Sequence, residues 1–438
     1  MKFPAKKLIC LIFAAVLSFT CATPAFAAIN ESLLGDGFYV NKEEDFKYQK
    51  YTLASGVYEE HFYLNNAAGD APKRCFAVEI DLQNSNNSIL AGYNDGDTDE
   101  WSLRSVRTQA KNMAAKHNVS VVCSINGGFY DTYTGEPYGL LVMSGKLCHT
   151  PTGKQPYFAI LKNGTAVIRD AGVGTADVVE GVEGGQRLVK GGKNVAPTAK
   201  REPRCAVGVK ADGKVVFFVG DGRQLKSVGH TYTELANIMI ALGCVEAIEM
   251  DGGASATMLT RRPSETALTL HHIPSLGYER PVSSSLHVAV TPAPTASKIT
   301  IGSSVDFADV NGTSMINITD NTSVRAAKTG IAFSYAKNEA GTLVLAAATL
   351  ATGMQLVLEK SGKIADTKTV IVPGDTDCDG TISAADARIA LRASVGLETI
   401  SDAAAAAASV DGSDGISAAD ARLILRASVA LENSIKWL

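Results

Sequence analysis

The chain has 438 residues, of which 46% are hydrophobic, and it carries a formal net charge of −4 at pH 7. A chain of this length predicts two or three domains. Its mildly acidic balance, with basic residues scattered along the sequence, argues against nucleic acid as a partner.

Residues 1–27 have the three parts of a secretory signal peptide. Lysines at the start precede an apolar run at Leu8–Phe19, and Ala25-Phe26-Ala27 is a small-x-small cleavage site. The apolar run is too short to span a bilayer comfortably, and no later stretch approaches the roughly 20 residues that a membrane helix needs. We therefore expect a secreted protein without a transmembrane segment.

Six cysteines follow this segment, widely spaced and without a paired metal-ligand motif. They are Cys75, Cys123, Cys148, Cys205, Cys244 and Cys378. We expect most of them to be buried thiols, and their spacing leaves the disulfide state open.

Within residues 28–290 one local arrangement occurs twice: a helix, a short turn, a buried strand and then an Asx-Gly-Gly turn. The two copies are 103–114, Ser120–Ile125 and Asn126-Gly127-Gly128, and 235–242, Val245–Met250 and Asp251-Gly252-Gly253. Hairpin signals lie between them at Ser144-Gly145, Asn163-Gly164 and Asp212-Gly213. The pattern predicts an α+β domain with helices and a mixed or antiparallel sheet.

The two Asx-Gly-Gly turns predict a functional site at the ends of their strands. Glycines allow a positive φ and a close approach of a ligand to main-chain N–H groups. Successive N–H groups in such turns form concavities that bind anions such as phosphate or carboxylate.

Six separated motifs occupy the same region. They are SINGGFYD (Ser124–Asp131), EPRCAVGV (Glu202–Val209), GDGR (Gly220–Arg223), HTYTELANIMIALG (His230–Gly243), MDGGASATM (Met250–Met258) and ERPVSSSLHV (Glu279–Val288). In this order they resemble the motifs of the phosphodiester glycosidase family, over most of residues 75–290. The resemblance implies hydrolysis of a glycosidic bond to a phosphate, or of a related glycan linkage. Ala254 stands where the family usually has a third glycine and Cys205 where threonine is usual, so the substrate's identity stays open.

Cleavage at the anomeric carbon of a sugar phosphate needs a carboxyl group and a clamp for the phosphate charge. Because phosphate is a good leaving group, we expect one carboxylate to act as base or nucleophile. Asp251 is the first choice for it and Asp221 the second, and Asn126 is grouped with them as a catalytic residue. A catalytic metal is left open.

Arg204 and Arg223 are the predicted phosphate clamp, because a guanidinium grips two oxygens at once. The alternative for Arg204 is a surface ion pair. His230 is a possible catalytic acid, but its place at the entrance to a helix favours a polar loop residue. The remaining predicted substrate-binding groups are Ser255 and the amides of Gly127, Gly128, Gly252 and Gly253.

Residues 291–297 form a Pro-containing linker, and residues 298–372 are rich in short β-forming runs and polar turns. We expect this segment to be a small β-sandwich spacer. A glycan-binding role is the alternative.

Residues 373–438 contain a duplication: ISAADARIALRASVGLE (Ile382–Glu398) and ISAADARLILRASVALE (Ile416–Glu432). The first copy overlaps the pattern D-x-D-x-D-G-x5-D, which begins at Asp375 and is typical of a calcium loop flanked by a helix. Its expected Ca²⁺ ligands are Asp375, Asp377, Asp379, Thr381 and Asp386. The calcium loop and its repeated helix resemble a dockerin, which implies an all-α calcium-binding tail.

The second loop departs from this pattern. Counting back from Asp420 places Ser409 at position one and Ser413 at position five, with Asp414 where glycine is wanted. Either the loop is one residue short and uses Asp411 and Asp414 differently, or it binds calcium weakly. The expected ligands in this loop are Asp411 and Asp420.

The dockerin resemblance implies a cohesin domain of an extracellular or cell-surface scaffold protein as the partner. The expected contact residues are Ala384, Ala385, Arg388 and Arg392 in one copy, or Ala418, Ala419, Arg422 and Arg426 in the other. The sequence as a whole indicates a secreted glycoside hydrolase tethered to such a scaffold. Two alternatives stay open: a glycan-binding module that does not cleave, and a hydrolase of phosphate-free glycans.

Overall fold

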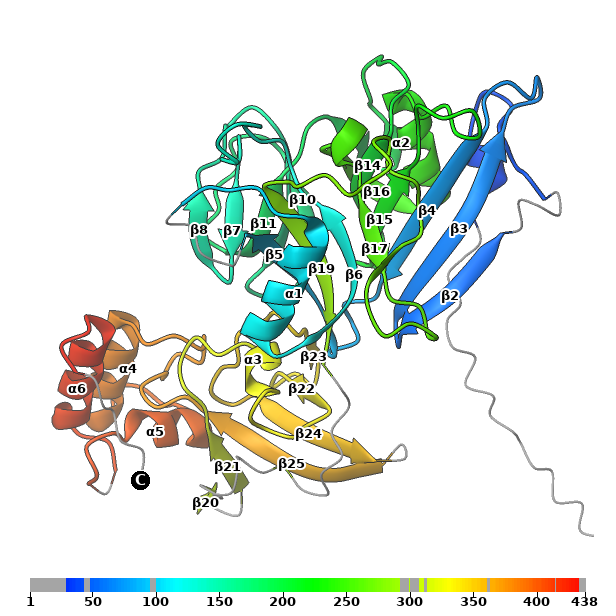
Figure 1. The fold of residues 1–438 in the computed structure, drawn as a ribbon. Helices are drawn as coiled ribbons and strands as arrows, with labels where there is room; N and C mark the ends of the chain where they lie inside the picture. Colours follow the sequence, from blue (N-terminus) through cyan, green and yellow to red (C-terminus); the bar gives the residue numbers. More distant parts are fainter. Residues whose placement is uncertain are drawn as a thin grey trace, which may run out of the picture.

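The computed structural model describes residues 29–42, 48–94, 100–291, 299, 307–310, 313–360, 363–413 and 415–432. The predicted signal peptide, Asp414 and nearly all of the linker at 291–297 lie outside these residues. The chain is built mostly of strands in antiparallel sheets with few helices (Figure 1). Among the described residues, none of the helices combines the length and the apolar character that crossing a bilayer requires.

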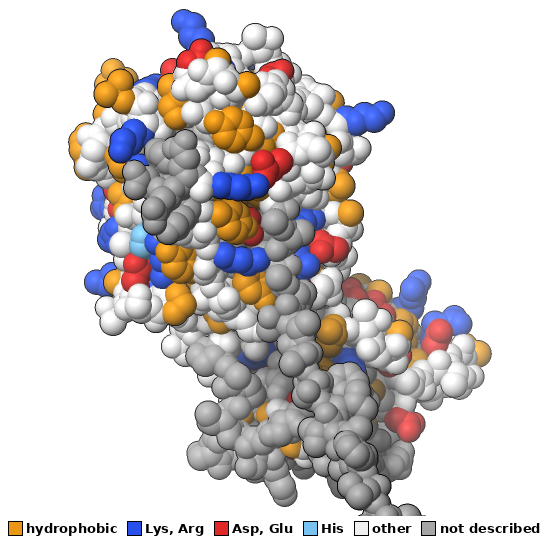
Figure 2. Space-filling view, turned by 90° about the vertical axis from the view of Figure 1, so that its right-hand side faces the viewer, with side chains coloured by type: hydrophobic (Ala, Val, Ile, Leu, Met, Phe, Trp, Pro, Cys, Tyr) orange, Lys and Arg blue, Asp and Glu red, His pale blue; other side chains and the backbone are white. Residues whose placement is uncertain are grey.

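The largest sheet of the N-terminal region is antiparallel, in the order β1-β3-β4-β15-β14-β16-β12-β13, with β2 paired to β3. Its strands are β1 (Tyr39–Val40), β2 (Gln49–Ala54), β3 (Val57–Asn65), β4 (Lys73–Ile80), β12 (Arg187–Lys190), β13 (Lys193–Asn194), β14 (Arg204–Lys210), β15 (Val215–Gly220) and β16 (Cys244–Met250). Figure 2 shows the face over β2 and β3, where hydrophobic side chains are scattered among basic and acidic ones. Charged side chains of this kind disfavour pairing of an edge strand with another chain.

Helix α2 (Tyr232–Ala241) covers one face of this sheet. The short 3₁₀ helix η1 (Glu31–Leu33) lies beside it. Thr231 and Glu234 form a capping box that starts α2, and Gly243 ends the turn after it with φ of +92°. Leu235, Ile238 and Met239 are buried against the strands. The predicted helical face is confirmed.

A second sheet packs on the opposite face, in the order β18-β17-β6-β19-β5. Its strands are β5 (Asn87–Tyr93), β6 (Ser120–Asn126), β17 (Met258–Thr260), β18 (Thr269–Leu270) and β19 (Ser284–Val290). Phe217 and Ile248 of the first sheet share one core with Ile125 and Leu286 of the second. Helix α1 (Val106–His117) covers the outer face, where Met113 packs with strands β5 and β19.

A third sheet completes the N-terminal region, in the order β10-β9-β11-β7-β8. Its strands are β7 (Leu141–Met143), β8 (Lys146–His149), β9 (Tyr157–Leu161), β10 (Ala166–Arg169) and β11 (Val178–Glu183). Ser144-Gly145 joins β7 to β8, Asn163-Gly164 joins β9 to β10, and Asp212-Gly213 joins β14 to β15. The three predicted hairpins are therefore confirmed.

The middle segment forms one sheet among its described residues, in the order β20-β21-β25-β24-β22-β23. Its strands are β20 (Phe307–Val310), β21 (Thr313–Asn317), β22 (Tyr335–Lys337), β23 (Leu343–Val344), β24 (Gln355–Lys360) and β25 (Lys363–Ile371), and β21 runs parallel to β25. For the described residues of this segment the expected β-sandwich is wrong, because their strands form one sheet. Short helix α3 (Val324–Ala327) and loops cover one face, and helix α5 (Asp402–Ala408) covers the other, so no second sheet is needed to bury either face.

The C-terminal segment contributes α4 (Ala384–Ser394), α5 and α6 (Ala418–Ser428), shown in orange to red in Figure 1. Ala387 and Ala390 of α4 pack on Ala421 and Ile424 of α6. Small side chains allow this close packing. Capping boxes at Ser383 and at Ser417 start the two helices.

The contact of α5 with the middle sheet can be tested by overpacking. Ala407 is fully buried against Met315 and Ile371. We expect Ala407→Leu to lower the free energy of unfolding by about 1–3 kcal/mol, because a leucine does not fit without displacing these neighbours. Urea denaturation measures the loss. Ala405→Leu, on the partly exposed side of the same helix, is the control, and an equal loss in both variants would contradict this packing.

Candidate active site and calcium loops

The two Asx-Gly-Gly turns lie together although 125 residues separate them. Asn126 Nδ2 donates to the backbone carbonyl of Asp251 at 2.6 Å, and the Asp251 amide donates to the carbonyl of Gly127 at 3.0 Å. Asn126 Oδ1 accepts from the amide of Thr257 at 2.9 Å. Asn126 is completely buried, so the structure assigns its side chain to holding Asp251 in place.

Glycine is required in the two turns by close packing at Gly128 and by a positive φ at Gly253. A Cβ on Gly128 would lie 2.0 Å from the carbonyl oxygen of Glu183, and Gly253 has a φ of +59°. The Gly127 amide donates to the carbonyl of Ser284 at 2.7 Å, and the Gly253 amide donates to that of Pro203 at 2.8 Å. These two amides are therefore committed within the protein. The Gly252 amide donates to the Asp251 carboxylate.

Asp251 lies at the end of β16 and is partly buried. Burial raises the pKa of its carboxyl to about 6, and the charge of Glu249 acts in the same direction. A hydrogen bond from Ser255 and the positive charge of Arg280 oppose this rise. A carboxyl that titrates near pH 6 is suited to proton transfer or nucleophilic attack near neutral pH.

Arg280 and Tyr130 complete the group of side chains around Asp251. Arg280 Nη1 lies 3.4 Å from Ser255 Oγ, and Tyr130 Oη lies 3.3 Å from the same oxygen. Sequence reasoning missed both residues. Each lies inside one of the six motifs, at ERPVSSSLHV and SINGGFYD, and that position was the available signal.

The two arginines predicted as a clamp have different surroundings. Arg223 leaves about half of its side chain exposed, donates from Nε to Glu202 at 2.6 Å, and approaches Gly253 with Nη2. Arg204 is buried and donates to Glu249 at 2.8 Å and to two backbone carbonyls. The structure thus places Arg223 at the Asp-Gly-Gly turn, whereas Arg204 forms a buried ion pair with Glu249.

Asp221, the second choice for the catalytic carboxylate, is buried among its own partners. Its carboxylate accepts from His272 Nδ1 at 3.0 Å and from the amide of Ile273 at 3.1 Å. His272 Nε2 accepts from the amide of Met258, so the proton of this imidazole is on Nδ1. Asp221 therefore anchors the segment that follows β18.

A pocket of about 430 Å³ opens beside Glu249 on strand β16. Glu249, two residues before Asp251, lines it together with the aromatic side chains Phe129, Tyr138 and Tyr232. Burial raises the pKa of Glu249, while hydrogen bonds with Tyr232 and Arg204 oppose the rise. Aromatic walls with a few placed polar groups are typical of small-molecule sites.

The first predicted calcium loop brings three carboxylates together. Ligand oxygens of Asp375, Asp377 and Asp386 all lie within 4.8 Å of one another. Burial and then the charges of Asp386, Asp379 and Asp375 raise the pKa of Asp377 to about 6. This mutual repulsion is what a bound cation relieves, so the residues fit Ca²⁺. Asp379 Oδ1 accepts from the Thr381 hydroxyl at 2.6 Å within the same loop.

The second loop has the same backbone framework with fewer acids. Asp420 Oδ1 accepts from the amides of Val410 and Asp411, as Asp386 Oδ1 does from Thr376 and Asp377 in the first loop. Ser409 stands at the position of Asp375, and its hydroxyl donates to the carbonyls of Ser413 and Gly415. The described part of this loop therefore closes on itself through hydrogen bonds.

The predicted cohesin-contact residues occupy equivalent places on α4 and α6. Three of the four in each copy are exposed, and the fourth is partly exposed. The exposed ones are Ala384, Arg388 and Arg392 and, in the second copy, Ala418, Arg422 and Arg426. The two copies thus present matching faces.

The raised pKa of Asp251 predicts a pH-dependent effect on stability. The folded-state pKa of about 6 exceeds the ordinary value of 3.8, so its stabilising contribution is complete below pH 3.8 and is lost as the pH rises through about 6. We expect Asp251→Asn to raise the free energy of unfolding by roughly 1–2 kcal/mol at pH 7.5 and to change it little at pH 4. Urea denaturation at both pH values, with Asp402→Asn as an exposed control, measures this. A loss of stability at both values would instead mark Asp251 as a structural turn residue.

Residues 120–289 match the sequence model of the family described as phosphodiester glycosidase. An SPbeta prophage-derived protein of Bacillus subtilis (strain 168) is 33% identical over 91 residues, which are 20% of this chain and 13% of that protein's length. The chain therefore spans a small part of this curated relative.

Among solved structures, similarity extends to the catalytic domain of zebrafish N-acetylglucosamine-1-phosphodiester alpha-N-acetylglucosaminidase, with 22% identity and a TM-score of 0.44 over 55% of this chain and 87% of that one. A hypothetical protein from Synechocystis has 13% identity and a TM-score of 0.45 over 58% of this chain and 68% of that one. The family match places a phosphodiester glycosidase-like domain at residues 120–289, the stretch that carries both Asx-Gly-Gly turns.

Proposed function

We propose that the N-terminal region is a glycosidase-type hydrolase that cleaves a sugar phosphodiester, with Asp251 as its reacting carboxylate. The observation that carries the proposal is the position of Asp251. Its backbone joins the two Asx-Gly-Gly turns, and its carboxyl, with a pKa of about 6, is next to Ser255 and Arg280. The family match at residues 120–289 supports hydrolysis of a phosphodiester glycoside.

The chemistry follows from the charges around Asp251. At pH 7 most Asp251 carboxyls are ionised, so the group acts as a base toward water or as a nucleophile at the anomeric carbon. Arg280, which contacts Ser255, and Arg223, which approaches Gly253, supply positive charge for the departing phosphate. The aromatic pocket beside Glu249 holds the sugar. Asn126 and Arg204 act as positioning residues, the first for Asp251 and the second for Glu249.

We further propose that residues 373–438 form a calcium-dependent, dockerin-like module, and that the chain is secreted and bound to a scaffold through a cohesin domain. The three converging carboxylates of the first loop support calcium binding. The matching exposed faces of α4 and α6 support docking through either copy. The signal-peptide pattern at residues 1–27 supports secretion.

The enzymatic proposal predicts substrate-selective turnover. The full chain is incubated with sugar-1-phosphodiesters and with phosphate-free α- and β-aryl glycosides, beside Asp251→Asn and the exposed control Asp402→Asn. We expect sugar release from the diesters only, with a loss of at least about a hundredfold in Asp251→Asn, the order that a positioned acid or base contributes. The rate kcat/KM should rise with pH through about 6, because the ionised carboxylate reacts.

Other results separate the alternatives. Turnover of the aryl glycosides would instead indicate a hydrolase of phosphate-free glycans. Saturable glycan binding without turnover, unchanged in Asp251→Asn, would indicate a glycan-binding module. A rate that falls as the pH rises through 6 would assign Asp251 the role of a general acid.

The two loops predict one tight calcium site. We expect calorimetric titration to show one high-affinity Ca²⁺ per chain and its loss in Asp375→Asn/Asp377→Asn, because both carboxylates face the same cation. Binding to a cohesin should require this calcium. Ser409→Asp/Ser413→Asp should add a second site by restoring acids at positions one and five. Two equivalent sites in the wild-type chain, or none, would contradict the assignment.

A further inference from the structure

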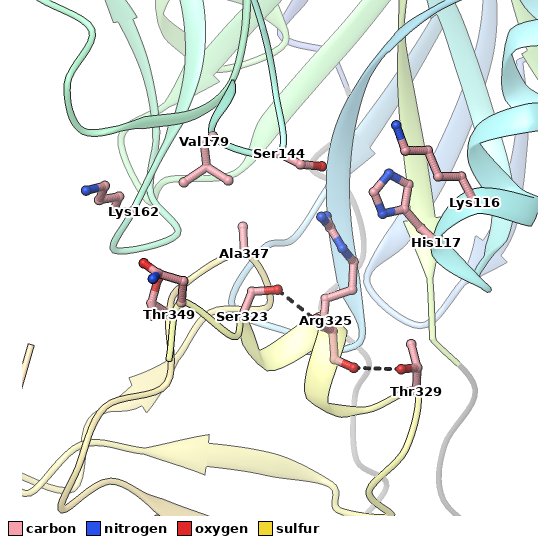
Figure 3. A pocket seen from close by; sticks show the side chains of 13 residues that line it. Lys116, His117, Ser144, Lys162, Val179, Ser323, Arg325, Thr329, Ala347 and Thr349 are labelled. Carbon is pink, nitrogen blue, oxygen red and sulfur yellow. Dashed lines mark hydrogen bonds between the residues drawn. The ribbon is translucent and has the colours of Figure 1, made fainter. Parts of the chain in front are cut away.

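A second pocket of about 430 Å³ lies where the N-terminal region meets the middle segment (Figure 3). The end of α1, the β7–β8 turn and β11 form one side of it. Helix α3 and the segment that contains Ala347 and Thr349 form the other side. It shares no lining residue with the pocket beside Glu249, so it is separate from the candidate active site.

Arg325 is the central group of this pocket. Only 6% of the residue is exposed, and its Nη2 lies 3.4 Å from Glu180 Oε1. Its Nη1 is buried and has no hydrogen-bond partner among the described residues. Figure 3 shows the guanidinium rising into the pocket toward Ser144 and His117. Because a buried N–H group without an acceptor is unfavourable, an oxygen of a bound ligand would stabilise this arrangement.

The charged side chains that line the pocket are basic. Lys116, Lys162 and Arg325 line it together with the imidazole of His117, and among the described residues that line it there is no aspartate or glutamate. His117 and Lys116 lie at one end and Lys162 at the other (Figure 3). Burial, with Arg325 and Lys116 contributing, lowers the pKa of His117 to about 4, as expected at a positive potential. The chain as a whole carries a net charge of −4, so the positive charge at this pocket is local. A local excess of positive charge favours binding of an anion.

Glu180 partly balances Arg325 but is shared with other donors. Its Oε2 accepts from the amides of Ala91 at 3.1 Å and Ser144 at 3.2 Å. The Glu180–Arg325 contact, at 3.4 Å, is longer than a strong charge-assisted hydrogen bond. Arg325 therefore retains the capacity to contact a second anion.

The remaining lining groups suit a ligand with hydroxyls. Ser144, Ser323, Thr329, Thr349 and Asn321 supply hydroxyl and amide groups. The volume is within the range of small-molecule sites and large enough for a monosaccharide. We propose that this pocket binds an anionic saccharide, with its phosphate or carboxylate at Arg325 and its hydroxyls at these polar side chains. The site is independent of the chemistry at Asp251.

Calorimetry on the full chain tests the proposal with glucose 6-phosphate and glucuronate, beside glucose and inorganic phosphate. We expect at least one of the two anionic sugars to bind at one per chain and more tightly than glucose or phosphate alone. The sugar that binds identifies the charged group. Lys116→Gln/Lys162→Gln should weaken this binding at least tenfold. Lys42→Gln/Lys193→Gln removes two exposed lysines elsewhere and should leave it unchanged.

Glu180 and His117 provide readouts that locate the ligand. Glu180→Gln should tighten binding, because it frees Arg325 from its ion pair. The double variant Glu180→Gln/Arg325→Gln should abolish binding, and because it removes both members of the pair it leaves neither charge buried alone. In nuclear magnetic resonance titrations the pKa of His117 should rise when the anionic sugar is bound. If neither anionic sugar binds, or if the lysine variant and its control bind equally, the pocket holds solvent and the proposal is wrong.

Discussion

The buried side chain of Asn126 is the contact on which the candidate active site depends. Strand β6 belongs to one sheet and β16 to another, and the Asn126 amide joins the ends of the two strands. Its Nδ2 donates to the main-chain carbonyls of Gly127 and Asp251, and its Oδ1 accepts from the amide of Thr257. A buried amide satisfied in this way holds one backbone geometry, because each lost bond leaves a polar group unpaired. The position of the Asp251 carboxyl follows from this constraint.

Opposing effects set the pKa of Asp251, and burial is the largest of them. Burial and the nearby Glu249 favour the neutral carboxyl, while Ser255 and Arg280 favour the ionised form. Arg204 is tied to Glu249 and so restrains the second carboxylate on the same strand. Among the described residues, Arg280 and Arg223 supply positive charge near Asp251 and its turn, and they come from two different loops.

The middle segment contacts both the N-terminal region and the C-terminal segment. Its sheet packs on α5, and Arg325 and Lys328 carry its contacts with the N-terminal region. The first predicted calcium loop contacts it as well, since Asp375 accepts from the amide of Thr352 and Gly380 accepts from that of Asn321. This loop and the pocket at Arg325 thus share one structural support.

Local patterns determined much of this protein from the sequence alone. The helices containing Met113 and Ile238, the three hairpins and the acids of the first loop depend on residues close together in the chain, so their spacing was sufficient. The single middle sheet and the partners of Arg204, Asp221 and Arg280 were decided by tertiary structure. Which face α5 covers, and which charges meet across two sheets, depends on strand order and packing between distant segments, and neither is encoded in local spacing.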